Sequence, residues 1–331
     1  MASSWPSLYN LAPVWAQNLL LTGFSALLHR ERYGGQFKEF RELLSRMERA
    51  TPSVIADYQD AKLREVVGHA YATVPYYRRV FDERGLKPGD VRGRADLAKL
   101  PILTRRDIQQ NFDDLRSRAF KPKELRLGHT SGTTGSPLEV YYDARVIYIT
   151  YALMDRQYRW AGARLERNGD RAVVLRGNVI VPVSQKRPPY WRHNRFHNQM
   201  LMSSFHLSTD HLPLYVQAIE RFRPAVLDGY PSTCYVLARH LLDSGRTLPL
   251  RAVITSSETL YDFQREAIER AFECRVFDYF AAAERVLFAT ECERHEGHHV
   301  SEEYGVLEVL DEWHQPLPRG QTGTLVATSL H

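Results

Sequence analysis

The feature that most limits the fold is an alternation of short apolar runs and helical patterns between residues 225 and 279. The runs 225–229, 251–255 and 275–279 predict strands, and the segments 232–242 and 260–272 between them predict helices. Strands joined through helices by short links form parallel βαβ units. We therefore expect an α/β fold with a parallel sheet.

The residues that follow these three strands are candidates for a binding site, because open parallel sheets bind ligands at the carboxyl ends of their strands. A carboxylate there can hold Mg²⁺ against phosphate, and an aromatic ring can stack on a base. For Glu284 the alternative is an exposed residue near a helix N-terminus, where the helix dipole favours an acid. The three groups are Gly229, Tyr230, Pro231 and Ser232; Ser256, Ser257 and Glu258; and Phe280, Ala281, Ala282, Ala283 and Glu284.

A run of glycine and hydroxyl residues precedes this region and ends in a proline. Glycines let a loop turn successive backbone N–H groups toward phosphate oxygens, and Ser and Thr hydroxyls add donors. No Gly-Lys-Ser/Thr follows, so the run is not a Walker A loop. The alternative is a hairpin turn that leads into a strand at 138–142. The run consists of Thr130, Ser131, Gly132, Thr133, Thr134, Gly135, Ser136 and Pro137.

The rest of the chain shows helical patterns first and strand patterns last. Helical spacing at 37–47 and 58–72 is followed by a short helix after Pro75, and Thr104 with Asp107 predicts a helix N-cap. The segment 186–198 is rich in Arg, His and Pro, so we expect a polar loop. Alternation at 305–310 and 323–328 predicts an antiparallel pair of strands.

Composition excludes several classes of protein. Charged residues make up 25% of the chain, the net charge is only +5, and Lys and Arg are interleaved with acids, so we expect no nucleic-acid partner. Three cysteines favour free thiols in a reducing cytoplasm. The apolar run 11–28 contains polar residues and predicts a buried or interfacial helix, with a membrane-surface helix as the alternative.

The motifs together resemble the adenylate-forming acyl-CoA synthetase superfamily, in its phenylacetate–CoA ligase-like branch, which includes proteins of capsular polysaccharide gene clusters. The run 130–137 is similar to the phosphate loop of that family, and further matches follow the family's order along the chain. They are Val74-Pro75-Tyr76-Tyr77-Arg78, Leu100-Pro101-Ile102-Leu103-Thr104, Gly229-Tyr230-Pro231-Ser232 and Glu284-Arg285-Val286.

The resemblance implies a role for each motif. It assigns Thr130, Ser131, Gly132, Thr133, Thr134 and Gly135 to the phosphates of ATP, and Ser256, Ser257 and Glu258 to the border of adenine. Phe280 is expected to stack near adenine and Glu284 to bind Mg²⁺. Tyr230 and Pro231 are assigned to substrate binding, and His206 resembles a residue that gates the acyl pocket, with a structural histidine as the alternative.

The chain departs from the family pattern in three respects. Leu138 stands where many members have Lys, and Phe280, Ala281 and Ala283 replace Tyr, Gly and Thr or Ser. The sequence stops before the hinge and the mobile C-terminal domain of the family, so we expect residues 1–100 to form an N-terminal helical region and 101–331 an adenylation core without that lid.

A separate cluster of four residues offers a metal alternative. Cys292, His295, His298 and His299 supply side chains that zinc accepts, which leaves a zinc-dependent hydrolase as one hypothesis. The Arg and His side chains of 186–198 are expected to be solvated, with an acidic partner or CoA phosphates as the alternative.

The hypothesis from the sequence is ATP-dependent carboxylate activation and transfer to CoA, with Glu284, Thr133, Thr134 and His206 as catalytic candidates. It requires ATP, Mg²⁺, a small carboxylic acid and CoA, in the cytoplasm and without membrane contact. A homodimer is left open. The alternative is a non-catalytic protein that binds a nucleotide or an acid without turnover, or that acts as a partner protein within a polysaccharide pathway.

Overall fold

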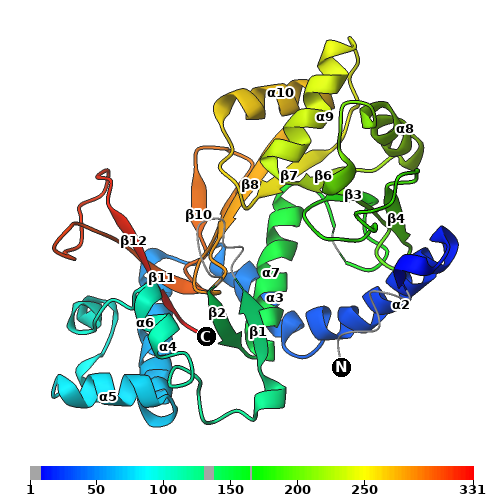
Figure 1. Ribbon diagram of the computed structural model, residues 1–331. Coiled ribbons are helices and arrows are strands. Elements are labelled where there is room, and N and C mark those ends of the chain that lie inside the picture. The colour runs from blue at the N-terminus through cyan, green and yellow to red at the C-terminus, as the bar shows by residue number, and fades with distance from the viewer. Residues whose placement is uncertain (1–8, 130–137, 165) are drawn as a thin grey trace. The chain divides into compact units, whose positions relative to one another are not determined.

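The computed structural model describes residues 9–129, 138–164 and 166–331 (Figure 1). The chain divides into two compact units that are interleaved in sequence. The sheet unit comprises Met1–Arg32, Met154–Phe280 and Thr290–His299, and the helical unit comprises Tyr33–Leu153, Ala281–Ala289 and Val300–His331. The division into domains at residue 100 concerns the organisation of the family and stays a prediction.

A mixed sheet forms the core of the sheet unit, and within the described residues its strand order is β10-β9-β8-β7-β6-β3-β5-β4. Strands β5, β3, β6, β7 and β8 run parallel to one another, and β4 pairs antiparallel with β5. The predicted α/β fold with a parallel sheet is confirmed. The bounds are β3 (Ala172–Leu175), β4 (Trp191–Asn194), β5 (Gln199–Met202), β6 (Val226–Gly229), β7 (Ala252–Ser256), β8 (Arg275–Ala281), β9 (Phe288–Glu291) and β10 (His298–Val300).

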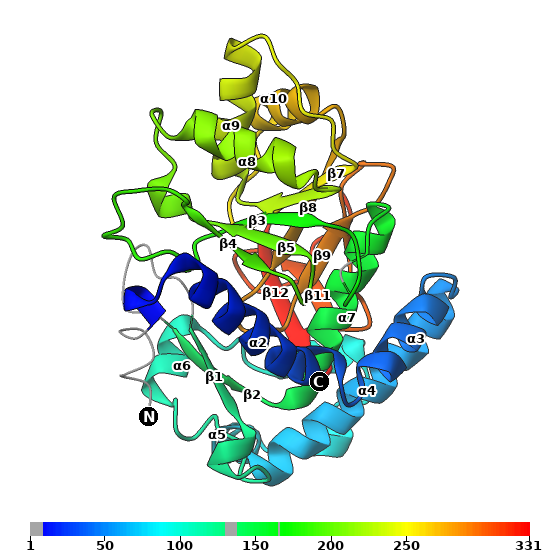
Figure 2. The same cartoon turned by 90° about the vertical axis from the view of Figure 1, so that its right-hand side faces the viewer.

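Helices cover both faces of this sheet (Figures 1 and 2). On one face lie α8 (Leu212–Phe222), α9 (Pro231–Asp243) and α10 (Asp262–Phe272), and on the other lies the C-terminal part of α7 (Ala144–Trp160). Successive residues of a strand point to opposite faces of the sheet. Val253 therefore packs in the core under α8, α9 and α10, whereas Ala252 and Ile254 pack in the core under α7. Burial on both faces explains why β6 and β7 are largely apolar in sequence, with Asp228 as the one charged residue of the two strands.

The prediction of a solvated polar loop at 186–198 is right for the part before β4, where Lys186 and Arg187 are exposed, but it is wrong further on, because β4 lies there and forms the edge of the sheet. Its residues alternate between half-buried and buried positions, and Arg192 is 0% exposed. The Arg192 guanidinium donates to the carbonyls of Pro189 (2.9 Å) and Trp191 (2.8 Å) and to the amide oxygens of Gln185 (2.8 Å) and Gln17. These bonds satisfy the charged group inside the protein, which composition alone could not reveal.

Helix α2 (Val14–Tyr33) packs on β4 through its polar side. Asn18 Oδ1 accepts a hydrogen bond from the backbone N–H of His193 (2.9 Å), and Thr22 Oγ1 accepts one from that of Arg195 (3.2 Å). The expected helix is present, but its apolar residues are not buried, since Trp15 is 67% and Leu27 71% exposed. Across the described residues, every helix falls short of the length or apolarity needed to cross a membrane.

The helical unit begins with α3 (Phe37–Met47), α4 (Pro52–Thr73) and α5 (Pro75–Glu83), close to the predicted helices. Proline occupies the first helical position of α4 and α5, where its missing N–H costs nothing. Helix α6 (Arg105–Gln110) has the predicted N-cap: Thr104 Oγ1 accepts from the Asp107 N–H (3.2 Å). Short 3₁₀ turns are η1 (Pro88–Asp90), η2 (Arg94–Lys99) and η3 (Pro122–Glu124), with η4 (Ser204–His206) in the sheet unit.

The last two strands of the chain pack on these helices. Strands β11 (Gly305–Leu310) and β12 (Thr324–Ser329) pair antiparallel, as predicted. Leu63 and Val67 of α4 share one core with Val306 of β11 and with Leu330. The helical unit is therefore held together by contacts between segments more than 200 residues apart in sequence.

Acid is expected to destabilise the sheet unit through His197, which is buried beside His29 with 3.2 Å between Nε2 of His197 and Nδ1 of His29. Burial, with the charges of His29 and Arg32, lowers the pKa of His197 to about 4. In the unfolded chain the His197 ring takes up a proton near its ordinary pKa of 6.5, whereas in the folded protein it does so only near 4. The contribution of neutral His197 to the stability of the fold is therefore complete above pH 6.5 and is lost as the pH falls toward 4. We expect wild type to lose about 1 kcal/mol more stability than His197→Gln between pH 7 and pH 5 in urea denaturation.

The contribution of His298 to stability changes with pH in the opposite direction, but it does not affect this comparison. Its hydrogen bond to Asp278 raises the pKa of His298, so its contribution is present below the ordinary value and is lost as the pH rises. Because both proteins contain His298, its effect cancels in the difference. Equal losses in wild type and His197→Gln would contradict the assignment.

Candidate functional site

The carboxyl ends of four strands lie side by side at one edge of the sheet unit. In the parallel register Leu175 of β3 lies opposite Gly229 of β6, which lies opposite Thr255 of β7. Ser256 in turn lies opposite Tyr279 of β8. The expectation that the segments after β6, β7 and β8 begin at the same end of the sheet is confirmed by this register, up to Phe280 of β8. Phe280 is 52% exposed there.

Tyr230 and Pro231 form the entry to α9, with Pro231 at its first position. The phenol of Tyr230 packs against Gly177, where an added Cβ would lie 2.9 Å from the Tyr230 hydroxyl oxygen. Thr233 Oγ1 donates to the carbonyl of Leu175 (3.2 Å). The connections after β3 and β6 therefore pack directly on one another.

The turn Ser256–Glu258 leaves the end of β7 in a fixed conformation. Ser256 is buried, and Ser257 has a φ of +70°, a left-handed value that is uncommon for residues other than glycine. The Glu258 carboxylate accepts from the backbone N–H of Ser232 (3.1 Å) in the first turn of α9. The turn thus holds an unusual backbone shape while Ser257 and Glu258 stay exposed.

A buried ion pair at this edge was not predicted from the sequence. Arg176, directly after β3, binds Asp228 of β6 through Nε (2.8 Å) and Nη2, and donates from Nη1 to Ser256 Oγ (2.7 Å). The second oxygen of Asp228 accepts from the Tyr158 hydroxyl (2.7 Å), and burial together with Asp228 raises the pKa of Tyr158. The only signal in the sequence was the acid within the apolar run 225–229.

The glycine and hydroxyl run lies outside the described residues, so nothing places Thr130, Ser131, Gly132, Thr133, Thr134 or Gly135. The strands on either side, β1 (Arg126–His129) and β2 (Glu139–Tyr142), pair antiparallel with His129 opposite Glu139. The run therefore joins two paired strands of the helical unit. The phosphate loop and the hairpin turn both require this connection, so the pairing does not distinguish them.

Glu284 lies in the helical unit, in a turn between β8 and β9 rather than at a helix N-terminus, so that alternative is wrong. The Arg285 N–H donates to the carbonyl of Ala282 (3.1 Å), and the Arg285 guanidinium lies over the ring of Tyr142 at 5.1 Å from its centroid. No hydrogen bond or ion pair joins the Glu284 carboxylate to another residue of the described chain. A carboxylate is the kind of ligand that a hard cation such as Mg²⁺ prefers.

His206 is buried with both ring nitrogens in hydrogen bonds. Nε2 lies 3.1 Å from the carbonyl of Gln185, which can only accept, so Nδ1 accepts from the Ser203 hydroxyl (2.8 Å). The ring stacks on Tyr190 with centroids 4.8 Å apart. These contacts are those expected of a structural histidine, and they leave no ring nitrogen for proton transfer.

The four residues of the zinc alternative do not meet at one point, although two of them, Cys292 and His299, are in contact. His298 Nε2 binds Asp278 (3.1 Å), His299 Nε2 lies 3.2 Å from Cys292 Sγ, and the ring of His295 packs on Phe277. Among the residues that the structure describes, no three His, Cys, Asp or Glu side chains are arranged to hold a metal ion. The structure therefore does not support a zinc-dependent hydrolase.

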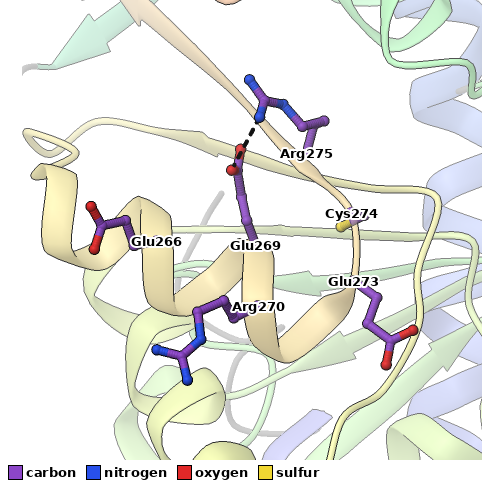
Figure 3. A pocket seen from close by; sticks show the side chains of 6 residues that line it. All are labelled: Glu266, Glu269, Arg270, Glu273, Cys274 and Arg275. Carbon is purple, nitrogen blue, oxygen red and sulfur yellow. Dashed lines mark hydrogen bonds and ion pairs between the residues drawn. The ribbon is translucent and has the colours of Figure 1, made fainter.

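A hollow in the surface of the sheet unit lies at the amino ends of the parallel strands, opposite the carboxyl ends described above. Its lining comes from the end of α10 and the start of β8, and Glu269 binds Arg275 across it at 3.5 Å (Figure 3). Because parallel sheets bind ligands at the carboxyl ends, we assign no function to it. The lining residues are Glu266, Glu269, Arg270, Glu273, Cys274 and Arg275.

Comparison with curated proteins gives a consistent group of relatives. The chain is 30% identical to the phenylacetate-coenzyme A ligase of Pseudomonas putida over 297 residues, which are 88% of this chain and 66% of that protein. It is 28% identical to the protein CapK of Staphylococcus aureus over 286 residues, which are 86% of this chain and 61% of CapK. The chain thus spans less than two thirds of these relatives, and no protein-family model matches it.

Comparison with solved structures gives the same fold. A 2-hydroxyisobutyryl-CoA ligase, solved in an open conformation with 2-HIB-AMP and CoA, matches with a TM-score of 0.61 at 21% identity. The match covers 82% of this chain and 64% of that one. A second structure of that ligase, in a postadenylation state, matches with a TM-score of 0.63.

Proposed function

Because the chain belongs to the phenylacetate–CoA ligase-like branch of the adenylate-forming enzymes, we propose that it activates a carboxylic acid with ATP and passes the acyl group to CoA. A carboxylate oxygen attacks the α-phosphorus, the bond to the β-phosphate breaks, and pyrophosphate leaves. The CoA thiolate then attacks the acyl carbon, and AMP leaves with the pair of electrons of the broken C–O bond.

The observation that carries this proposal is the carboxyl edge of the sheet. Ser256–Glu258 forms a turn with a left-handed residue there, fixed by Arg176 on one side and by α9 on the other. Backbone strain of this kind persists where the surroundings enforce it and is common at ligand sites. We propose that the turn borders adenine, with Phe280 stacked nearby and Tyr230 and Pro231 against the acid.

The phosphate end of the nucleotide requires groups that offset the repulsion between two anions. We propose this role for the hydroxyls and N–H groups of 130–135, with Thr133 and Thr134 closest to the reaction. Mg²⁺ would supply positive charge at the phosphates, and the Glu284 carboxylate fits a hard cation because it has no partner among the described residues. For His206 we propose a place in the wall of the acid pocket rather than a part in proton transfer, because both its ring nitrogens are hydrogen-bonded.

The proposal also includes the cellular compartment and the biosynthetic role of the reaction. Three free cysteines, one of them buried, favour a reducing cytoplasm, and the resemblance to this branch favours a role in polysaccharide biosynthesis.

A second candidate is binding of a nucleotide or an acid without turnover. Leu138 favours it: this residue stands where many members of the superfamily have Lys, and it is 2% exposed. A cation that would neutralise phosphate charge is thus replaced by a core residue.

Titration calorimetry with Mg–ATP, followed by acid-dependent exchange of pyrophosphate into ATP, tests both candidates. We expect saturable binding of Mg–ATP and exchange that depends on an added aryl or alkyl acid. Binding without exchange for any acid would support the second candidate. No binding of Mg–ATP would contradict activation of an acid with ATP, and titrations that show no binding of an acid either would contradict the second candidate as well.

A further inference from the structure

Arg176 ties together the carboxyl ends of four strands. It follows β3 directly, binds Asp228 of β6 and Ser256 of β7, and lies over the ring of Tyr279 of β8, with its Cζ 5.6 Å from the ring centroid. Its side chain is 17% exposed and that of Asp228 is 8% exposed. The proposed reaction gives this ion pair no chemical step, and its contact with the reaction site is the bond to Ser256.

The chemistry of the pair suits a geometric role. The planar guanidinium offers donors in a fixed fork, so it sets direction as well as distance, which a lysine does not. Asp228 is itself fixed, because its second oxygen accepts from Tyr158 on α7. Burying such a pair brings little net stability, so its location is more informative than its energy.

The group that Arg176 reaches is the first residue of the Ser256–Glu258 turn. Its Nη1 donates to Ser256 Oγ, and Ser256 Oγ lies 3.2 Å from Ser257 Oγ. Ser257 holds the left-handed conformation and is exposed. The orientation of the Ser256 side chain therefore depends on Arg176. The orientation of the exposed Ser257 side chain depends in turn on its hydrogen bond with Ser256.

We propose that Arg176, held by Asp228, is a positioning residue that fixes the Ser256–Glu258 turn for recognition of the nucleotide base. This inference rests on the proposed function, because it takes the turn as the border of adenine. A turn held in one shape accepts one base and excludes others, whereas a loosened turn accepts several. Arg176 thus acts on base selectivity through Ser256, without touching the nucleotide.

The test compares dissociation constants for Mg–ATP and Mg–GTP in wild type, Arg176→Met, Arg176→Lys and Asp228→Asn. We expect wild type to prefer ATP at least tenfold, and Arg176→Met and Asp228→Asn to reduce this ratio at least fivefold. Arg176→Lys keeps the charge but loses the fork, so its ratio should fall between wild type and Arg176→Met. If Arg176→Met does not fold, Arg176→Lys and Asp228→Asn decide the question.

Arg265→Met is the matched control, because Arg265 also binds a buried carboxylate of the sheet unit, that of Glu291 at 2.6 Å. It should leave the ATP/GTP ratio within twofold of wild type, since a loss of folded protein alone changes the number of sites and not their selectivity. Unchanged ratios in the Arg176 and Asp228 variants, with Mg–ATP bound by wild type, would overturn the positioning role alone. Failure of wild type to bind Mg–ATP would overturn this role together with the proposed function.

Discussion

Glu284→Gln should reduce acid-dependent ATP–pyrophosphate exchange by about 10²–10³-fold, the usual effect of removing one well-placed electrostatic group from an active site. The amide keeps the shape of the side chain but loses the negative charge that a hard cation requires. The affinity for ATP should also lose its dependence on Mg²⁺. Calorimetric titrations of ATP with and without Mg²⁺ measure this second effect independently of turnover.

Glu302→Gln is the matched control for this prediction, because Glu302 is an exposed carboxylate of the same unit. We expect its exchange rate and its Mg²⁺ dependence to equal those of wild type. Glu284→Asp keeps the charge on a shorter side chain and should retain part of both. Full exchange in Glu284→Gln would exclude Glu284 as the magnesium ligand.

Arg192→Ala should have the largest effect on stability and cost about 3–5 kcal/mol. The substitution removes a fully buried side chain and leaves acceptors on Gln17, Gln185 and Pro189 without a donor, each at a cost of about 1–3 kcal/mol before relaxation. It also removes the bond from Arg192 to Gln17, one of the contacts that join α2 to the edge strand β4. Urea denaturation of the intact chain measures the change.

Arg195→Ala provides the comparison, because Arg195 lies three residues further on and its side chain is exposed. Its backbone N–H binds Thr22, and that bond does not depend on the side chain. We expect a change within about 0.5 kcal/mol, as for other surface positions. Similar losses in both variants would contradict the placement of Arg192 in the core.

The sequence was sufficient where structure is local or buried on both sides. The bounds of α3 match the prediction, and the strands and helices from β6 to β8 lie within two residues of it. Strands buried on both faces give continuous apolar runs, and Thr104 with Asp107 makes a local N-cap. Such signals depend on neighbours in the chain, so a single sequence shows them.

The sequence was insufficient where distant segments meet. Strand β4 was hidden by its Arg and His residues, since the groups that satisfy Arg192 include Gln17, 175 positions away. Arg176 and Asp228 are 52 positions apart, and neither stands in a motif. Helix α2 turns its polar side inward because the edge strand offers backbone N–H groups, which reverses the usual relation between hydropathy and burial.

Photoaffinity labelling with 8-azido-ATP, followed by peptide mapping, tests the central claim most directly, because the azide is carried by the adenine ring. The label should be displaced by unmodified ATP and should lie in the peptides that contain Ser256–Glu258 or Phe280. Two results would contradict a nucleotide site at the carboxyl ends of the strands. One is label in the hollow at Glu266–Arg275 that unmodified ATP displaces, and the other is that ATP displaces no label from any peptide.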